Sequence, residues 1–181
     1  LDYKVMHIMN ITDIDDKTIK KSINENKSLG EITNFYTDSF FDDVATLNIL
    51  PAHSYPRATN FIDDMIEMIK VLISKENAYE TSDGSVFFKI SSFPEYGRLA
   101  RLNPDEMKIG DRIDSDEYEK QEVRDFALWK SYKEEDGNVF WDSPWGKGRP
   151  GWHIECSCMS IHYLGTHFDI HCGGVDNIFP H

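Results

Sequence analysis

The sequence predicts an α/β domain whose sheet is interrupted in the middle of the chain. Residues 5–8 form a strand-like segment that leads into a polar loop and then into helices. A further helix and a second strand-like segment follow the loop at residues 143–151. The block between these two parts, residues 91–140, is mixed and rich in charge, which is typical of an insertion or a small α+β subdomain. Strand and helix segments on both sides of such a block favour one sheet covered by helices.

The first half of the chain is predicted to be mainly helical. Ile19 and Ile23 would form the apolar face of a first helix at residues 16–26. Ser28 and Glu31 have the spacing of a capping box, in which each side chain bonds a backbone amide at a helix start. We expect the helix that follows to bury one apolar stripe, formed by Ile32, Phe35, Tyr36, Phe40, Val44 and Leu47.

A third helix and a β-hairpin are predicted in the middle of the chain. Residues 48–56 end the second helix, and Thr59 is the expected cap of the third. One face of this helix carries the apolar residues Ile62, Met65, Ile66, Ile69 and Ile73. Residues 79–81 and 86–90 flank an Asp-Gly pair at residues 83–84, which is a typical hairpin turn.

The last part of the chain is predicted to contain a helix followed by a strand. The Gly/Pro-rich loop at residues 143–151 leads into a helix at residues 152–164. Residues 167–171 alternate like a strand, and Gly173-Gly174 ends it. Two glycines after a strand let the backbone approach a ligand at the carboxyl edge of a sheet, and they equally suit a tight turn.

Composition and charge limit the classes of protein to which the chain can belong. Hydrophobic residues make up 40% and aromatic residues 13%, which suits a packed core and excludes a disordered chain. No apolar run approaches the roughly 18 residues of a membrane span. The chain starts without an initiator Met or a signal peptide, so we expect an internal piece of a soluble, cytoplasmic protein. The net charge of −13 argues against tight nucleic-acid binding by this segment alone, and the acidic run at residues 111–122 is interpreted as solvated surface.

Three cysteines lie close together near the end of the sequence. Cys156, Cys158 and Cys172 are an odd number in one short stretch, which favours metal chemistry in a reducing compartment over a disulfide framework. Cys156 lies early in a predicted helix, where the helix dipole favours a thiolate and therefore a zinc ligand. The imidazole of His181 is a second candidate ligand. Their spacing alone is a weak signal, and core packing of Cys156 stays open.

Three further polar or aromatic residues are candidates for a small-molecule site. Asp176 could pair with a substrate ammonium group, or cap a turn. Trp152 could form the wall of a pocket, or pack in the core as most tryptophans do. His171 could donate a hydrogen bond to a ligand, or be structural.

Several motifs together resemble the cysteinyl-tRNA synthetases. Residues 10–17 read Asn-Ile-Thr-Asp-Ile-Asp-Asp-Lys, and residues 148–157 read Gly-Arg-Pro-Gly-Trp-His-Ile-Glu-Cys-Ser. Residues 171–176 read His-Cys-Gly-Gly-Val-Asp, and residues 179–181 read Phe-Pro-His. They are similar to blocks of that family in the same order, and the resemblance covers essentially the whole chain.

The resemblance implies a fold and a division of the chain. The fold is a partial class I catalytic domain of the Rossmann type, interrupted by an α+β connective insertion. Residues 1–64 would be the first part of the catalytic domain, residues 65–147 the insertion, and residues 148–181 the second part.

The resemblance also implies one zinc ion per subunit, held by two Cys, one His and one Glu. Cys156 matches the second Cys and His181 matches the His. The first Cys would lie before residue 1, and the Glu would lie beyond residue 181. Cys172 stands where the family usually has Gly, and we expect its side chain to point into the core rather than to compete for the metal.

The implied reaction is the activation of L-cysteine by ATP with Mg²⁺, followed by its transfer to tRNA(Cys). Thr12, Trp152, His171 and Asp176 are the candidate residues around the amino acid, with Asp176 facing its ammonium group. No side chain of this segment is expected to be catalytic. The family's nucleotide signatures, His-Ile-Gly-His and Lys-Met-Ser-Lys-Ser, do not occur in the 181 residues, so we expect this segment alone to be inactive. The tRNA contacts are expected outside it, and the parent enzyme is expected to be a monomer.

Three other functions remain open at the level of sequence. A related ligase could join cysteine to an amino-sugar acceptor through the same adenylate chemistry. The chain could also be a zinc-stabilised binding or regulatory fragment without catalysis. A zinc hydrolase is the weakest of the three, because Glu155 should point to the other side of the helix from Cys156 and could not serve as a base beside the metal.

Overall fold

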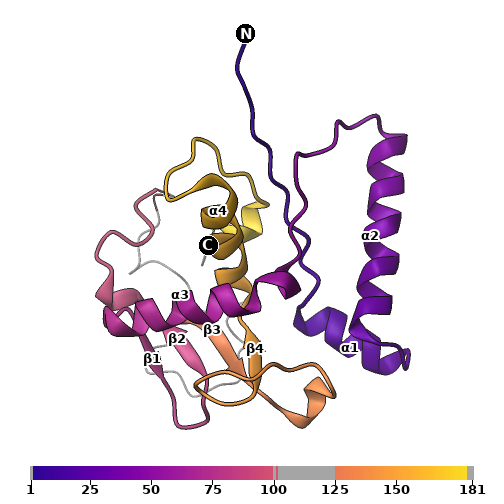
Figure 1. Cartoon of the computed structure of the whole chain (residues 1–181). Helices are drawn as coiled ribbons and strands as arrows, with labels where there is room; N and C mark the ends of the chain where they lie inside the picture. Colours follow the sequence, from indigo (N-terminus) through magenta and orange to yellow (C-terminus); the bar gives the residue numbers. More distant parts are fainter. Residues whose placement is uncertain (1, 100, 102–124, 179–181) are drawn as a thin grey trace.

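A computed structural model describes residues 2–99, 101 and 125–178 of the chain (Figure 1). The acidic run at residues 111–122 and residues 179–181, which include His181, lie outside the described residues. In chain order the elements are α1 (Asp16–Asn24), α2 (Leu29–Thr46), the 3₁₀ helix η1 (Ala58–Phe61), α3 (Ile62–Ser74), β1 (Ala78–Glu80), β2 (Val86–Phe88), η2 (Ile90–Ser92), β3 (Phe126–Ser131), η4 (Glu134–Asp136), β4 (Gly148–Pro150), α4 (Trp152–Leu164) and η5 (Val175–Asn177).

The four strands form one antiparallel sheet in the order β1-β2-β3-β4. The predicted hairpin is confirmed: β1 pairs with β2 around a turn in which Gly84 has a φ of 84°. The register between β2 and β3 shifts after Val86, and β4 closes the sheet by pairing Trp129 with Pro150. Because Pro150 has no backbone N–H, it suits a strand that pairs on one side.

A second, parallel pairing joins the start of the chain to the segment that follows α2. Ile11 N donates to Pro56 O at 2.8 Å, and Ala58 N donates to Ile11 O at 3.1 Å. Isolated parallel bridges connect Ile8 with Ser54 and Ile11 with Arg57. The strand predicted at residues 5–8 is therefore displaced toward residues 8–11, because pairing with a segment 46 residues later sets the register. α1 and α2 form the crossover that a parallel pair requires.

Both N-terminal helices begin at the caps that local sequence supplies. Asp15 caps α1 through a reciprocal pair with Thr18, and Ser28 forms the predicted capping box with Glu31 at the start of α2. The predicted buried stripe on α2 is wrong in part. Ile32 is buried, whereas Phe35, Tyr36 and Leu47 are 64%, 48% and 68% exposed. α2 packs against α1 and stands apart from the sheet (Figure 1), so only a narrow face is covered by described residues.

Thr59 does not cap the third helix as predicted. Its backbone N and its Oγ1 donate to the carboxylate of Asp13 at 2.9 and 2.6 Å. η1 precedes α3, which starts at Ile62 without a side-chain cap. The polar groups of Thr59 serve a long-range contact that local spacing does not reveal.

The hydrophobic core lies where α3 and α4 meet the sheet. α3 packs on β1, and α4 packs on β3 and on α3 (Figure 1). The core cluster includes Met65, Ile69, Trp129, Ile154 and Met159, each at most 2% exposed. Residues separated by about 90 positions thus share one core, which fixes the start of α4 relative to the sheet.

The segment after α4 is not the strand that residues 167–171 predict. α4 has the predicted bounds, but the following residues have no regular structure, and Ile170 is 77% exposed. No strand among the described residues pairs with this segment, so its alternating pattern has no ladder to join. Within the described parts of the chain, no helix is both long enough and apolar enough to cross a bilayer.

Candidate functional site

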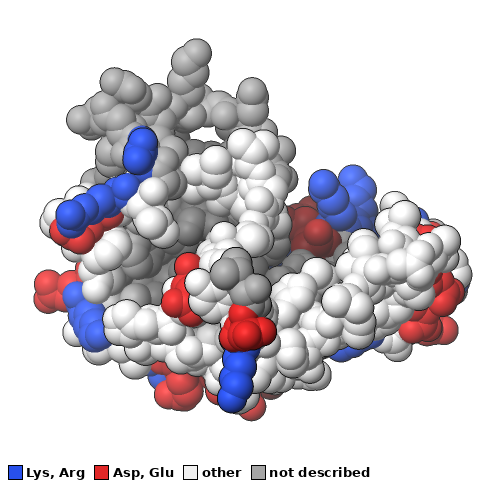
Figure 2. All heavy atoms as spheres, turned by 90° about the horizontal axis from the view of Figure 1, so that it is seen from above, with Lys and Arg blue, Asp and Glu red and all other residues white. Residues whose placement is uncertain are grey.

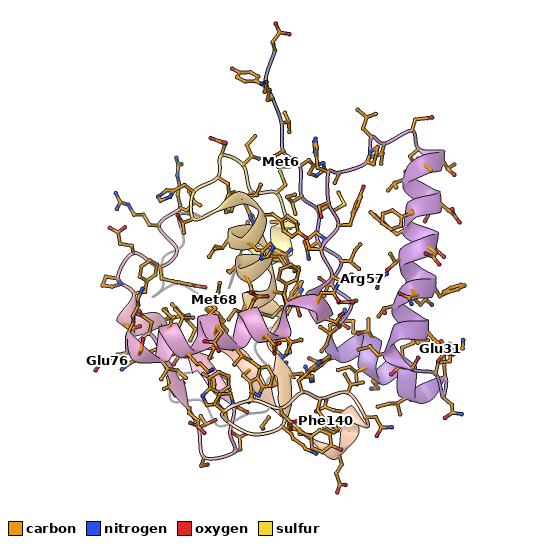
Figure 3. All side chains as sticks on the ribbon, viewed as in Figure 1. Met6, Glu31, Arg57, Met68, Glu76 and Phe140 are labelled. Carbon is orange, nitrogen blue, oxygen red and sulfur yellow. The ribbon has the colours of Figure 1, made fainter. Side chains whose placement is uncertain are left out.

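The loop that carries Thr12 lies at the carboxyl ends of the two parallel segments. Asn10 Nδ2 donates to Thr12 Oγ1 at 3.1 Å. The next residue, Asp13, is only 3% exposed and accepts both bonds from Thr59. Arg57 Nη1 lies 3.6 Å from Asp13 Oδ2, and Figure 3 labels Arg57 where the chain enters η1. The carboxyl ends of parallel strands are where open α/β sheets bind ligands.

A second carboxylate, that of Asp16 at the first position of α1, reaches the sheet. Asp16 Oδ1 accepts a hydrogen bond from Arg149 Nη2, and Asp16 Oδ2 lies 3.1 Å from Lys130 Nζ. Arg149 also donates from Nε to Asp136 Oδ1 at 3.1 Å. The side chains of Arg149 and Lys130 are 8% and 9% exposed, so this ion pair is mostly shielded from water on its basic side. Burial raises the pKa of Asp16, but Lys130 and Arg149 together bring that pKa below its usual value.

β4 delivers the first turn of α4 beside β3. Gly151 is the N-cap of α4, and a Cβ at this position would lie 1.9 Å from the carbonyl oxygen of Ala127. Only glycine therefore permits this approach of the two backbones. Trp152 is 39% exposed and Cys156 is half-buried, and their spacing of four places both on one face of α4.

The predicted thiolate at Cys156 is not favoured in this structure. Burial, with a smaller contribution from the neighbouring Glu155, raises the pKa of the Cys156 thiol to about 11. The position near a helix start does not offset this loss of solvation. Cys156 is therefore a neutral thiol unless a cation lies beside it. A half-buried thiol is a donor that suits zinc, which binds the deprotonated form.

Glu155 is a buried carboxyl group whose importance the sequence did not reveal. The residue is 0% exposed, and neither carboxylate oxygen has a hydrogen-bond partner among the described residues. Burial, followed by the charges of Asp13 and Asp15, raises its pKa to about 9 despite the opposing effect of Arg149. Glu155 thus faces the same acidic loop as Arg149. The only signal in the sequence was a Glu between two residues of the apolar face, Ile154 and Cys158.

The remaining predicted residues lie after α4. Cys172 is exposed, so the prediction that its side chain points into the core is wrong, and the segment that carries it has no regular structure that would turn it inward. His171 lines a pocket of about 680 Å³ between α3, α4 and the sheet, together with Gly173, Phe126, His153 and Ser157. Neither Thr12, Trp152 nor Cys156 lines this pocket, so the described candidates do not share one cavity. The side chain of Asp176 and all of His181 lie outside the described residues. Among the residues that the structure describes, no group of three His, Cys, Asp or Glu side chains gathers around a point that could hold a metal. The pairing of Cys156 with His181 stays a prediction.

Comparison with known proteins gives consistent matches over the whole sequence. A family model described as the class I (C) tRNA synthetase catalytic domain matches residues 1–181. A cysteine–tRNA ligase of Brachyspira hyodysenteriae is 56% identical over 181 residues, covering 99% of this chain and 38% of that protein. Those of Chlamydia caviae and Chlamydia trachomatis serovar D are 53% and 54% identical, covering 99% and 100% of this chain and 38% of each relative.

The matched relatives are much longer than this chain, which spans about two fifths of their length. The mixed arrangement of helices and an antiparallel sheet, with one parallel pairing at the N-terminal end, agrees with the predicted α/β class. The family match and the motif order agree along the whole sequence, and the chain belongs to the class I (C) tRNA synthetase catalytic domains.

Proposed function

We propose that this chain is the amino-acid-selecting part of a cysteine–tRNA ligase. The parent enzyme activates L-cysteine with ATP and Mg²⁺ and transfers it to tRNA(Cys). The observation that carries the proposal is the match of relatives named cysteine–tRNA ligase over at least 99% of the chain at 53–56% identity. The contact between Asp16 and Arg149 supports it, because Asp16 follows the loop that carries Thr12, and Arg149 on β4 precedes the start of α4, which carries Trp152 and Cys156.

Selection of cysteine is assigned to the first turn of α4. Cysteine and serine differ mainly in sulfur against oxygen, which the size of a pocket separates poorly. Zinc bound through Cys156 and His181 supplies a borderline-soft ion that prefers thiolate over hydroxyl. Trp152 offers a half-exposed ring as one wall beside Cys156. Thr12 offers a hydroxyl that accepts a hydrogen bond from Asn10. His171 and Asp176 are proposed as further polar contacts of the amino acid.

The residues of this chain hold the substrate and do not act as nucleophiles. The substrate carboxylate attacks the α-phosphorus of ATP, which gives an aminoacyl-adenylate and pyrophosphate. The rate then depends on alignment and on stabilisation of phosphate charge. The face drawn in Figure 2 shows Lys and Arg in separate small groups. Phosphate contacts are assigned to other parts of the enzyme, because the two nucleotide signatures do not occur in the 181 residues. We therefore propose that residues 1–181 alone are inactive, and that the parent enzyme is a cytoplasmic monomer.

The test is ATP–pyrophosphate exchange by the full-length protein with cysteine or serine, together with its zinc content. Cys156→Ser should lower kcat/KM for cysteine by roughly 100-fold or more and reduce bound zinc, since a lost ligand weakens the whole site. Cys158→Ala is the matched control, because Cys158 is buried in the core on the same helix, and it should alter stability without changing selectivity.

Three results would count against the proposal. Equal exchange with serine and cysteine by the wild-type protein would refute selection through sulfur. Adenylate formation by residues 1–181 alone would refute the proposed inactivity of the segment. If Cys156→Ser strongly lowered the folded fraction yet left selectivity unchanged in the protein that remains folded, the zinc-stabilised binding fragment would become the better description.

A further inference from the structure

Two carboxylates that follow Thr12 contact different parts of the molecule. One is Asp13 in the Thr12 loop, and the other is Asp16 at the first position of α1. Asp13 is bound by Thr59 and lies beside Arg57, at the entrance to η1 and α3. Asp16 is bound by Arg149 on β4 and by Lys130 on β3. Thr12 comes before both aspartates in the sequence, so its position depends on the contacts that Asp13 and Asp16 make.

Arg149 is the contact that links this loop to the start of α4. It lies three residues before Trp152 and seven before Cys156, on the short strand β4, which leads directly into α4. Its backbone pairs with Lys130 in the sheet, and Gly151 is pressed against Ala127. Because the backbone of Arg149 is fixed in the sheet, its bond to Asp16 holds the Thr12 loop relative to the first turn of α4. Loss of this bond would allow the two to move relative to each other.

The guanidinium is held on both sides. Nη2 donates to Asp16 Oδ1 and Nε donates to Asp136 Oδ1 at 3.1 Å, while Asp136 Oδ2 accepts from the backbone N of Lys133 at 2.9 Å. A planar guanidinium with two fixed carboxylates defines direction as well as distance, which a lysine ammonium does not. A single cation would be enough to neutralise Asp16, whose side chain is half exposed. The two-sided hold on Arg149 therefore also fixes the position of its guanidinium.

We propose that Arg149 is a positioning residue that sets the distance between the Thr12 loop and the first turn of α4, and thereby the affinity for the amino acid. The inference rests on the proposed function, since it assumes that Thr12 and the Trp152–Cys156 face contact one substrate. It adds a role for two residues, Arg149 and Asp16, that touch neither the substrate nor the metal.

The experiment uses the full-length protein and two mild substitutions. Asp16→Asn keeps the shape of the side chain but removes the ion pair, and Arg149→Lys keeps the charge but loses the two-sided geometry. Each should raise KM for cysteine about tenfold, which corresponds to about 1.4 kcal/mol and lies within the range usual for residues in contact, with kcat and KM for ATP changed less than about twofold. The double variant should raise KM by clearly less than the product of the two single effects, because both substitutions remove the shared Asp16–Arg149 contact, although each also alters one contact of its own, with Lys130 or with Asp136.

Asp83→Asn is the matched control. Asp83 accepts hydrogen bonds from Thr81, Ser85 and Ser131 in the hairpin region, so its substitution should lower stability without changing KM for cysteine. A purely structural role for Arg149 predicts the same behaviour as this control. Lower melting temperatures with unchanged KM in Asp16→Asn and Arg149→Lys would overturn the proposal.

A second measurement separates this inference from the proposed function. Alkylation of Cys156 by iodoacetamide in chelator-treated protein, followed by mass spectrometry of its peptide, reports the looseness of the first turn of α4 without any catalysis. Asp16→Asn should speed this alkylation several-fold and leave that of the exposed Cys172 unchanged. If Asp16→Asn speeds the alkylation but the wild-type protein shows no cysteine-dependent ATP–pyrophosphate exchange, the positioning role of Arg149 stands and the proposed function is rejected. If the alkylation rate is unchanged, the positioning role is rejected.

Discussion

At the scale of single residues, Glu155 shows how far burial can override the usual behaviour of a side chain. A carboxyl with no exposed surface, facing Asp13 and Asp15, has a pKa raised to about 9. It is therefore protonated at neutral pH, and the folded molecule holds a proton that the unfolded chain releases. The group contributes no charge to the acidic loop beside it.

This raised pKa gives stability a definite dependence on pH. The unfolded chain loses its Glu155 proton near the ordinary pKa of 4.5, whereas the folded chain keeps it up to about pH 9. Between these values the free energy of unfolding should fall as pH rises, by up to about 1.4 kcal/mol per pH unit from this group. Glu155→Gln, a neutral side chain of the same shape, should remove this slope and be more stable than the wild type at pH 8.

Urea unfolding of chelator-treated protein between pH 5 and pH 8 measures this difference. Glu67→Gln is the control, because Glu67 is an exposed carboxylate on α3, and this variant should keep the wild-type slope. Parallel curves for the wild type and Glu155→Gln would show that Glu155 is ionised in the folded state.

Residue identities predicted only part of this site. The sequence indicated Thr12, Trp152 and Cys156 through motif resemblance, and these roles stay predictions. It did not indicate that Asp16 and Arg149 pair, because nothing local links positions 133 residues apart. It also predicted a favoured thiolate at Cys156 from its place in a helix, and burial reverses that expectation.

At the scale of elements, the sequence predicted correctly those features of helices and strands that depend on residues close together in the chain. The bounds of α4, the capping box of α2 and the hairpin of β1 and β2 follow from caps, turns and periodicity. The strand expected at residues 167–171 and the cap expected at Thr59 failed. Both depend on partners that are distant in the sequence, one missing from the described part of the chain and one supplied by Asp13.

The junction between β4 and α4 gives an element-scale prediction. Gly151→Ala should destabilise the protein by at least about 2 kcal/mol, because its Cβ would lie 1.9 Å from the Ala127 carbonyl oxygen and the two backbones would have to separate. Gly30→Ala, inside α2 with no atom within 4 Å of the new Cβ, should instead stabilise by about 0.5–1 kcal/mol.

Chemical unfolding of both variants measures the contrast. A cost at Gly151 as small as the ordinary difference between glycine and alanine would mean that the strand and the helix start can move apart freely. That outcome would also weaken the proposed role of Arg149, which needs this junction to be stiff.

At the scale of the whole molecule, the described elements differ in how much of the core they share. α3, α4 and the sheet form one cluster, whereas α2 packs on α1 (Figure 1). The side chains of Phe35 and Tyr36 on α2 are exposed. Sequence patterning alone assigned α2 a broad buried stripe, since periodicity records which residues are apolar and not what covers them.

This difference predicts unequal local stability. Backbone amides in the middle of α2 should exchange hydrogen faster than those of α3 by a factor of ten or more, although α2 is the longer helix with 18 residues against 13. Fewer buried apolar contacts leave α2 free to open without disrupting the core. Hydrogen–deuterium exchange with mass spectrometry of the 181-residue chain tests this, and equal protection of the two helices would contradict it.

The contact between Asp16 and Arg149 has a further consequence during synthesis on the ribosome. At the usual elongation rate of 5–20 residues per second, the 133 residues between them take roughly 7–27 s to translate. During that interval the segment with the three aspartates is already synthesised, and its basic partner Arg149 is not. The nascent chain must keep this segment soluble without Arg149 and, for most of the interval, without Lys130. The contact of Asp16 with β3 and β4 therefore forms only after most of the 181 residues have been translated, whereas the pairing of Asp13 with Thr59 can form earlier.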